Sequence, residues 1–205
     1  MTTVTEAIDV GGARLVLERP AEPKSLIDED AFADDEFLPY WAERWPSGIA
    51  LAGDVSALND LRGGRMLEIG CGLGLPSLVA ARLGADVVAT DWSRDAIALL
   101  ERNASRNRLR VTAVPADWRD PDAIVSLGPF DLVVAADVLY EARNAAPILT
   151  LLATLGAPAA IADPGRRHAA AFLDAVPAGD WKIDTVTDAR IPQGGIHRLS
   201  RVRPS

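Results

Sequence analysis

A glycine-rich loop after a short apolar run is the first segment that could bind a ligand. In LEIGCGLG, Glu68 stands two residues before Gly70, and glycine recurs at Gly72 and Gly74. Glycines between a strand and a helix let the backbone approach a ligand, and the start of the helix supplies free N–H groups. The third glycine comes one residue too early for the dinucleotide pattern G-x-G-x-x-G, and Glu68 would repel a pyrophosphate. The loop therefore favours a cationic ligand, with a ligand-free turn as the alternative.

Acidic residues also follow the next two apolar runs. Asp91 comes 21 residues after Gly70, where a carboxylate can accept hydrogen bonds from both hydroxyls of a ribose. Its alternative role is to cap the following helix, for which Ser93 is also available. Asp117 and Trp118 are adjacent, so the acid could bond an adenine amine while the indole flanks the ring; a packed surface tryptophan is the alternative. Together these positions favour an adenosine-containing ligand.

A fourth apolar run ends in AADVLY, which places Asp137 and Tyr140 three residues apart. At that spacing, where a strand gives way to a turn, both side chains can face one cleft. A carboxylate beside a phenol suits the orientation of an amine nucleophile, and an aromatic ring attracts any cationic form. The alternative is a buried tyrosine next to a helix-capping aspartate.

These residues follow strands that alternate with helices. Such alternation predicts an α/β fold, namely a Rossmann-like, seven-stranded, mostly parallel sheet with helices on both faces. Ligands of such sheets bind beyond the carboxyl ends of the strands. The parallel strands are expected at Arg65–Gly70, Asp86–Asp91, Arg110–Val114, Phe130–Ala136 and Ala159–Asp163, the helices at Leu75–Leu83, Arg94–Asn107 and Asn144–Leu155, and two antiparallel edge strands at Trp181–Thr187 and His197–Arg203.

The length of 205 residues predicts a single domain over residues 1–205. Residues 1–62 form an N-terminal extension, in which a hairpin around Gly11 and Gly12 precedes an acidic stretch at 28–36 and an aromatic segment that could cover the ligand. Residues 63–205 form the Rossmann-like core. The uncharged run at 144–162 contains proline and glycine, and so predicts a helix and a buried strand instead of a membrane span.

The composition argues against several classes of ligand and partner. With 21 basic and 29 acidic residues the formal charge is −8, which argues against nucleic-acid binding. One cysteine and two histidines cannot form a zinc-finger ligand set, and no metal is expected. A single cysteine cannot form an internal disulfide, so the expected compartment is reducing and cytoplasmic. The N-terminus lacks the pattern of a signal peptide, and no membrane attachment is expected.

The motifs PYWAERWPSG, LEIGCGLG, ATDWS, DW and AADVLY occur in an order that resembles the seven-β-strand, S-adenosylmethionine-dependent methyltransferases. The likeness narrows to the family-16 group of protein lysine methyltransferases, which carry a D-x-x-Y motif after the fourth strand. Within that group the chain is most similar to the electron-transfer-flavoprotein β-subunit lysine methyltransferases and their bacterial relatives, also through IADPGR at 161–166. The resemblance covers about Leu38 to Pro204.

The resemblance implies a role for individual residues. Trp45 would contact S-adenosylmethionine from the N-terminal side, and Asp91 would bind its ribose. Asp137 and Tyr140 would face the substrate amine. The remaining cofactor contacts implied by the match are Glu68, Gly70, Cys71, Gly72, Trp92, Asp117, Trp118 and Ala136.

The expected function is therefore N-methylation of lysine side chains in a protein substrate, with the electron-transfer-flavoprotein β subunit as a candidate. N-methylation of a small-molecule amine is the alternative. A lysine amine, with an ordinary pKa of about 10.4, must lose its proton before attack, and Asp137 would hold it in line. Amino-methylation of DNA is disfavoured, because the motif lacks the Pro-Pro-aromatic sequence typical of those enzymes.

Several other residues have a simpler interpretation. Cys71 lacks an obvious base and is expected to contribute its backbone only. His168 is expected to face solvent. His197 is expected in the last strand, with a position facing the cleft as the alternative. The arginines at positions 102, 106, 108 and 110 are expected on the exposed side of a helix and its exit.

Overall fold

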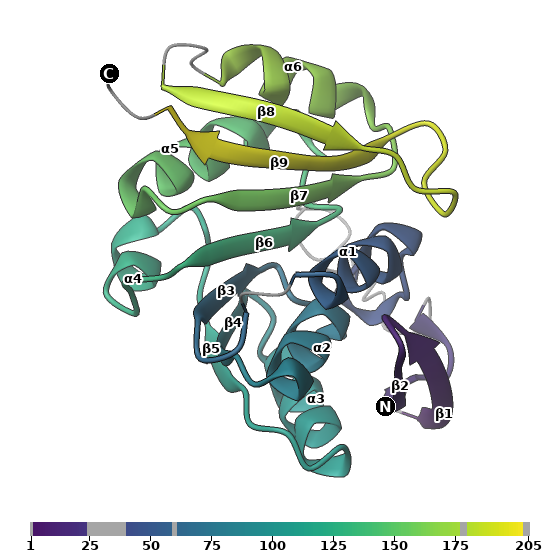
Figure 1. The fold of residues 1–205 in the computed structure, drawn as a ribbon. Helices are drawn as coiled ribbons and strands as arrows, with labels where there is room; N and C mark the ends of the chain where they lie inside the picture. Colours follow the sequence, from purple (N-terminus) through teal and green to yellow (C-terminus); the bar gives the residue numbers. More distant parts are fainter. Residues whose placement is uncertain (1, 24–39, 59–60, 177–179, 203–205) are drawn as a thin grey trace, which may run out of the picture.

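A seven-stranded sheet forms the centre of the protein (Figure 1). The computed structural model describes residues 2–23, 40–58, 61–176 and 180–202. Across the sheet the strands follow the order β5-β4-β3-β6-β7-β9-β8. Their bounds are β3 Arg65–Ile69, β4 Asp86–Asp91, β5 Thr112–Pro115, β6 Leu132–Ala136, β7 Ala159–Asp163, β8 Trp181–Val186 and β9 Gly195–Arg201. The Rossmann-like, mostly parallel sheet predicted from the sequence is confirmed.

The two C-terminal strands differ in one respect from the expectation. Strand β9 pairs antiparallel with both β7 and β8, so β8 runs parallel to the core strands. The connection from β7 to β8 passes through helix α6 (Arg167–Ala175), and a crossover of this kind returns the chain in a parallel direction. The crossover leaves a space one strand wide between β7 and β8, and β9 folds back from β8 to fill it.

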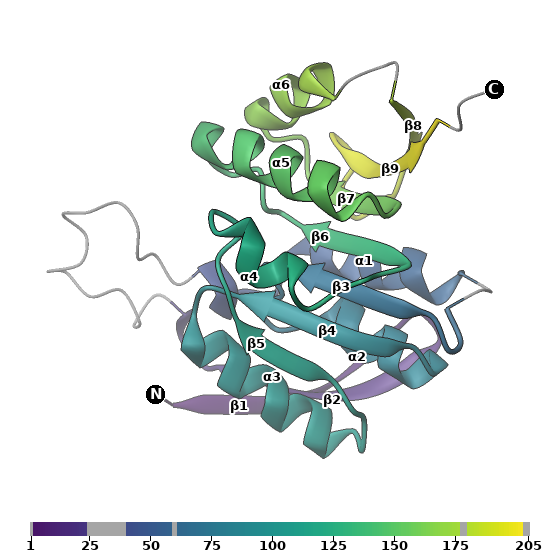
Figure 2. The same ribbon diagram turned by 90° about the vertical axis from the view of Figure 1, so that its left-hand side faces the viewer.

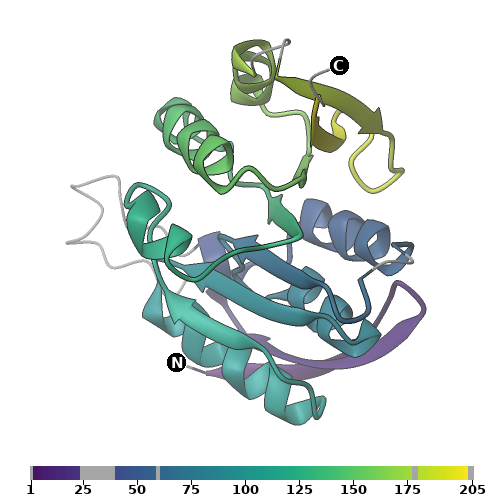
Figure 3. The ribbon, with the colours of Figure 1, turned by 60° about the vertical axis from the view of Figure 1, so that its left-hand side comes forward.

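Alternation along the strands builds a hydrophobic core on each face of the sheet. In β6, Val134 packs into one core, and Val133 and Ala135 pack into the other. The first core is covered by α1 (Pro46–Ser56), α2 (Leu75–Leu83) and α3 (Arg94–Arg106). The second lies under α4 (Pro121–Val125), α5 (Ala145–Leu155) and α6, and Figure 3 shows the two groups of helices on either side of the sheet. Helices on both faces leave the ends of the strands for a site.

An N-terminal hairpin forms a separate two-stranded sheet. Its strands are longer than the segments Ile8–Val10 and Arg14–Leu17 that the sequence predicts. Strands β1 (Thr3–Val10) and β2 (Ala13–Pro20) join at Gly11 and Gly12, whose φ values of 58° and 73° suit a tight hairpin turn. The hairpin lies against the outer surface of α3 (Figure 2). It thereby adds a layer outside the helices of the first core.

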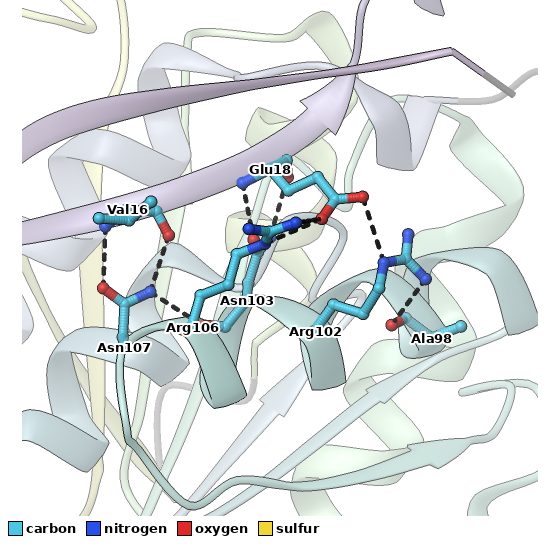
Figure 4. A network of polar contacts seen from close by, with 7 residues as sticks. All are labelled: Val16, Glu18, Ala98, Arg102, Asn103, Arg106 and Asn107. Carbon is cyan, nitrogen blue, oxygen red and sulfur yellow. Dashed lines mark hydrogen bonds and ion pairs between the residues drawn. The ribbon is translucent and has the colours of Figure 1, made fainter.

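Asparagine side chains of α3 bind the backbone of β2 with the pairs of hydrogen bonds that a neighbouring strand would make (Figure 4). The Asn103 amide accepts from the Glu18 N–H at 2.7 Å and donates to the Glu18 carbonyl at 2.9 Å. Asn107 makes the same pair of bonds with Val16, each at 2.8 Å. Four helical residues rise about 6 Å and two strand residues about 6.7 Å, so the two asparagines match alternate strand positions.

The Glu18 side chain anchors two of the arginines that were expected merely to face solvent. Its carboxylate accepts from Arg102 Nε at 3.2 Å and from Arg106 at 2.6 Å. Both arginines are less than half exposed, and they connect α3 to the hairpin. Sequence alone could not show this contact, because Glu18 is more than 80 residues away.

The uncharged run at 144–162 folds as the predicted helix and strand, α5 and β7. In the described parts of the chain, no helix has the length and apolarity needed to cross a membrane. The acidic stretch at 28–36 lies outside the described residues.

Candidate active site

A cleft with about 680 Å³ of empty space, part of it open to solvent, lies at the carboxyl ends of β3, β4 and β6. Ligand sites of doubly wound sheets occupy this position, where the strand order reverses. The structure brings nearly all of the predicted site residues into this one cleft. Those that line it are Trp45, Glu68, Gly70, Cys71, Gly72, Asp91, Trp92, Trp118, Ala136, Asp137 and Tyr140.

The glycine loop follows β3 in a conformation that other residues rarely adopt. Gly70, Gly72 and Gly74 have φ values of 63°, 50° and 70°. A Cβ on Gly70 would lie 2.9 Å from Trp118, and one on Gly72 would lie 3.0 Å from the Trp41 carbonyl oxygen. The loop can therefore keep this conformation and its packing against Trp118 and Trp41 only with glycine at positions 70 and 72.

Glu68 connects the loop strand to the helix that follows. Its side chain is buried, and one carboxylate oxygen accepts both the N–H of Ser77, at 2.9 Å, and the Ser77 hydroxyl. The N-cap residue of helix α2 is Gly74, which has no side chain that could cap the helix, so Glu68 satisfies one of the free N–H groups of α2. Burial raises the pKa of Glu68 to about 8, and the nearby Asp91 adds to the rise.

Asp91 is oriented by two backbone bonds at the end of β4. Its two carboxylate oxygens each accept one N–H at 2.9 Å, from Gly72 and from Ser93. The residue is 4% exposed, and burial raises its pKa to about 6. The helix cap is instead Ser93, whose hydroxyl accepts from the Ala96 N–H at 3.3 Å. Asp91 thus keeps unused lone pairs on both oxygens.

Two tryptophans line the cleft near Asp91. Trp118 is almost fully buried, and its indole N–H has no hydrogen-bond partner among the described residues. Trp92 also lines an adjoining hollow, which contains Asp117. Asp117 is the predicted cofactor contact that does not line the main cleft, and its carboxylate is held by Arg119 at 2.7–2.8 Å.

Asp137 follows β6 with a φ of 58°, a left-handed conformation that aspartate tolerates better than most residues. Its N–H donates to the Ala162 carbonyl on β7 at 2.8 Å. One carboxylate oxygen accepts from the Ser47 hydroxyl at 3.2 Å, and the other from Arg166 Nε at 2.5 Å. Sequence reasoning missed both partners: IADPGR contains Arg166, but nothing in the sequence links it to an acid 29 positions away.

Three aromatic residues, Tyr40, Trp45 and Tyr140, pack together along the cleft. The rings of Tyr40 and Tyr140 are 5.0 Å apart, and Tyr40 and Trp45 are 6.4 Å apart. The Trp45 indole donates to the Tyr40 carbonyl at 2.8 Å. Burial, with a smaller contribution from Glu141, raises the pKa of Tyr140 to about 12, so its phenol stays protonated at neutral pH.

The remaining candidates take no evident part in chemistry. Cys71 is buried, and burial raises the pKa of its thiol well above the usual range, which fits an inert side chain. His197 is buried and does not line the cleft, and its Nδ1 lies 3.0 Å from the Thr185 hydroxyl oxygen. His168 is partly exposed. Among the described residues, no group of three or more side chains could hold a metal ion.

Comparison with known proteins agrees with this geometry. Residues 42–162 match the family model described as lysine methyltransferase. The chain is 33% identical over 135 residues to the electron transfer flavoprotein beta subunit lysine methyltransferase of Xenopus laevis, which covers 62% of this chain and 53% of that protein. It is 41% identical over 97 residues to the magnesium-protoporphyrin O-methyltransferase of Rhodobacter capsulatus, which covers 46% of this chain and 42% of that protein.

Among solved structures, magnesium protoporphyrin IX methyltransferase from Synechocystis PCC 6803 with bound SAM superimposes with a TM-score of 0.61. The match covers 89% of this chain and 99% of that chain at 19% identity, and so establishes the shared fold. The chain spans about half the length of the two curated relatives named above.

Proposed function

The chain belongs to the lysine methyltransferase family, whose members depend on S-adenosylmethionine, and on that premise we propose that it methylates lysine side chains of a protein substrate. We further propose that residues 1–205 act as one methyltransferase domain, with the segment around Trp45 covering the cleft. The electron transfer flavoprotein β subunit is the candidate substrate, because a relative is named for it.

The residues of the cleft fit S-adenosylmethionine. Asp91 has a free lone pair on each oxygen, which suits the two hydroxyls of a ribose. Trp92 and Trp118 offer flat apolar surfaces for adenine, and the loop at Gly70–Gly72, including the Cys71 backbone, leaves room for the methionine part. Trp45 and Ala136 would complete the cofactor contacts from above and below.

Two acidic residues have more restricted roles in this proposal. Glu68 would add negative charge behind the loop only as it ionises near pH 8, and its carboxylate is already bonded to Ser77. The Asp117 carboxylate is held by Arg119 and lies outside the main cleft, so in this proposal Asp117 belongs to the rim of the cofactor site.

The cofactor supplies a methyl group that is already activated by attachment to a sulfonium. The protein therefore contributes mainly alignment and exclusion of water. Asp137 has lone pairs beyond those used by Ser47 and Arg166, and these can accept an N–H of the acceptor amine. The Tyr140 phenol stays protonated, so it positions the amine and does not act as its base. The proton of the amine leaves to solvent.

The observation that carries the proposal is that Asp137 and Tyr140 open into the same cleft as Asp91 and the glycine loop. An amine held by the first pair would therefore meet a cofactor held by the second group. A small-molecule acceptor is the second candidate, because another relative is named for the methylation of magnesium-protoporphyrin.

The test uses S-adenosylmethionine labelled on its methyl group, the purified chain, and either recombinant electron transfer flavoprotein β subunit or a lysate of the source cell. The proposal predicts label on lysine residues of a protein. Label confined to a small-molecule fraction would support the second candidate, and label on neither would reject both. Asp131→Asn changes an acid just before β6, at the end of the strand away from the cleft, and should transfer the methyl group as the wild type does.

A further inference from the structure

Arg166 holds the carboxylate that faces the proposed acceptor. Its Nε donates to an Asp137 oxygen at 2.5 Å, and its guanidinium carbon lies 5.5 Å from the centre of the Trp45 ring. The Asp137 side chain is 5% exposed and that of Arg166 is 32% exposed. The arginine therefore neutralises a buried charge from the solvent side.

The local backbone directs Arg166 toward Asp137. One oxygen of Asp163 accepts the N–H groups of Gly165 and Arg166, at 2.8 and 2.7 Å. Gly165 has a φ of 97°, and a Cβ there would lie 2.5 Å from the Gln193 carbonyl oxygen. The turn after β7 is thus fixed before the arginine side chain begins.

The charge balance of this pair determines which form of an amine it favours. An unpaired buried carboxylate would attract an ammonium and stabilise its proton, whereas the amine attacks only after losing that proton. A carboxylate already paired with a guanidinium offers hydrogen-bond acceptors without a net negative charge. Such a pair can orient a neutral amine without favouring its protonated form.

We infer that Arg166 is a positioning residue that makes the Asp137 pocket select the neutral amine of its acceptor. This inference rests on the proposed function, because it concerns the same acceptor site. It assigns to Arg166 control over the protonation state of the acceptor, in addition to the orientation of Asp137.

Other titratable groups face this pair from the surrounding elements. Asp163 lies behind it on β7, with one carboxylate oxygen unpartnered among the described residues, and His197 on β9 faces Asp163. Tyr40 acts on Arg166 from the entrance of the cleft, and Tyr140 follows Asp137. Burial keeps His197 neutral, since it lowers the pKa of that imidazole. Within the part of the chain that the structure describes, Arg166 is the cation in direct contact with Asp137.

The first test needs no variant. Butylamine, a truncated lysine side chain, is titrated into the wild-type protein saturated with S-adenosylhomocysteine, at pH values from 7.5 to 9.5. Because only the neutral fraction binds, the apparent affinity should rise about tenfold per pH unit. An affinity that stays level or falls with pH would overturn the inference.

The second test compares Arg166→Gln with Arg166→Lys, using Arg167→Gln as the exposed neighbouring control. Arg166→Gln should bind butylammonium at pH 7.5 at least tenfold more tightly than the wild type. With labelled cofactor and the electron transfer flavoprotein β subunit, its kcat should reach a plateau about one pH unit higher or more. Arg166→Lys should restore the wild-type profile, and Arg167→Gln should not change it.

The outcomes separate the two proposals. A loss of kcat in Arg166→Gln that is equal at every pH, with unchanged butylamine binding, indicates a purely structural arginine and overturns the inference. A wild-type protein that methylates no lysine contradicts the proposed function, and the butylamine titration then decides the inference without turnover.

Discussion

Replacing Glu68 by glutamine should stabilise the free protein at neutral and alkaline pH. The Glu68 side chain is buried, and a single carboxylate oxygen accepts both bonds from Ser77. The amide oxygen of glutamine can accept the same two bonds. The substitution therefore preserves the link between β3 and α2 and removes only the ionisable group.

The magnitude follows from the pKa of Glu68, which burial raises from an ordinary 4.5 to about 8. The unfolded chain releases this proton above about pH 4.5, whereas the folded protein retains it until about pH 8. The stability contributed by Glu68 is thus complete below pH 4.5 and is lost as the pH rises to 8. At about 1.4 kcal/mol per pH unit, the wild type should lose roughly 4 kcal/mol relative to Glu68→Gln between pH 5 and 8.

Urea unfolding of both proteins at pH 5, 7 and 9 measures this effect, because contributions from other groups cancel in the difference. The advantage of Glu68→Gln should grow with pH and level off above pH 8. Glu101→Gln, on the exposed surface of α3, should show no such trend. A constant or shrinking difference for Glu68→Gln would refute the argument that burial holds the proton.

The same substitution should weaken cofactor binding. Ionised Glu68 favours a nearby cation, and S-adenosylmethionine carries a sulfonium charge that S-adenosylhomocysteine lacks. Glu68→Gln should therefore lose more affinity for the former than for the latter, as calorimetry at pH 8 would show. Equal losses for both compounds would contradict a direct charge effect.

Further substitutions test the ligand site and the hairpin. Burial raises the pKa of Asp91 to about 6, so the affinity for S-adenosylhomocysteine should fall about tenfold from pH 7 to pH 5 as Asp91 takes up a proton. Calorimetry on Asp91→Asn should show weaker binding that does not change over this pH range. Trp45→Ala should lower that affinity in a protein with unchanged circular dichroism, whereas normal binding would remove Trp45 from the site. Asn103→Ala leaves two buried backbone groups of Glu18 unpaired and should reduce the free energy of unfolding by about 2–3 kcal/mol. Asn107→Ala, in a more exposed position, should reduce it by less than about 1 kcal/mol. Urea denaturation measures both. Equal effects of the two alanines would contradict the strand-like pairing in the buried position.

The fold was predictable because its signals are local. Apolar runs ending at Asp91 and Ala136, separated by amphipathic segments, predict a parallel sheet and its functional edge. The position of β9 between β7 and β8 was not predictable in this way, since either strand could occupy the edge according to its hydrophobic pattern alone.

The site was predictable to the extent that its residues follow strand ends. Gly70, Asp91 and Asp137 line one cleft because parallel strands finish at the same edge. The contacts of these residues depend on segments distant in sequence. Arg166 reaches Asp137 only through the turn after β7, and the Asp117 carboxylate is paired with Arg119 outside the main cleft. Charge pairing of this kind needs three-dimensional distances, which spacing along the chain does not provide.

Methyl transfer by Asp137→Asn tests the central claim most directly. The wild type and the variant are incubated with labelled S-adenosylmethionine and the electron transfer flavoprotein β subunit, and the binding of S-adenosylhomocysteine is measured on the same preparations. We expect label on lysine with the wild type, a loss of about 100-fold or more in the variant, and cofactor affinity that stays within about threefold. Near-normal transfer by Asp137→Asn would contradict the assignment of this carboxylate to the acceptor amine.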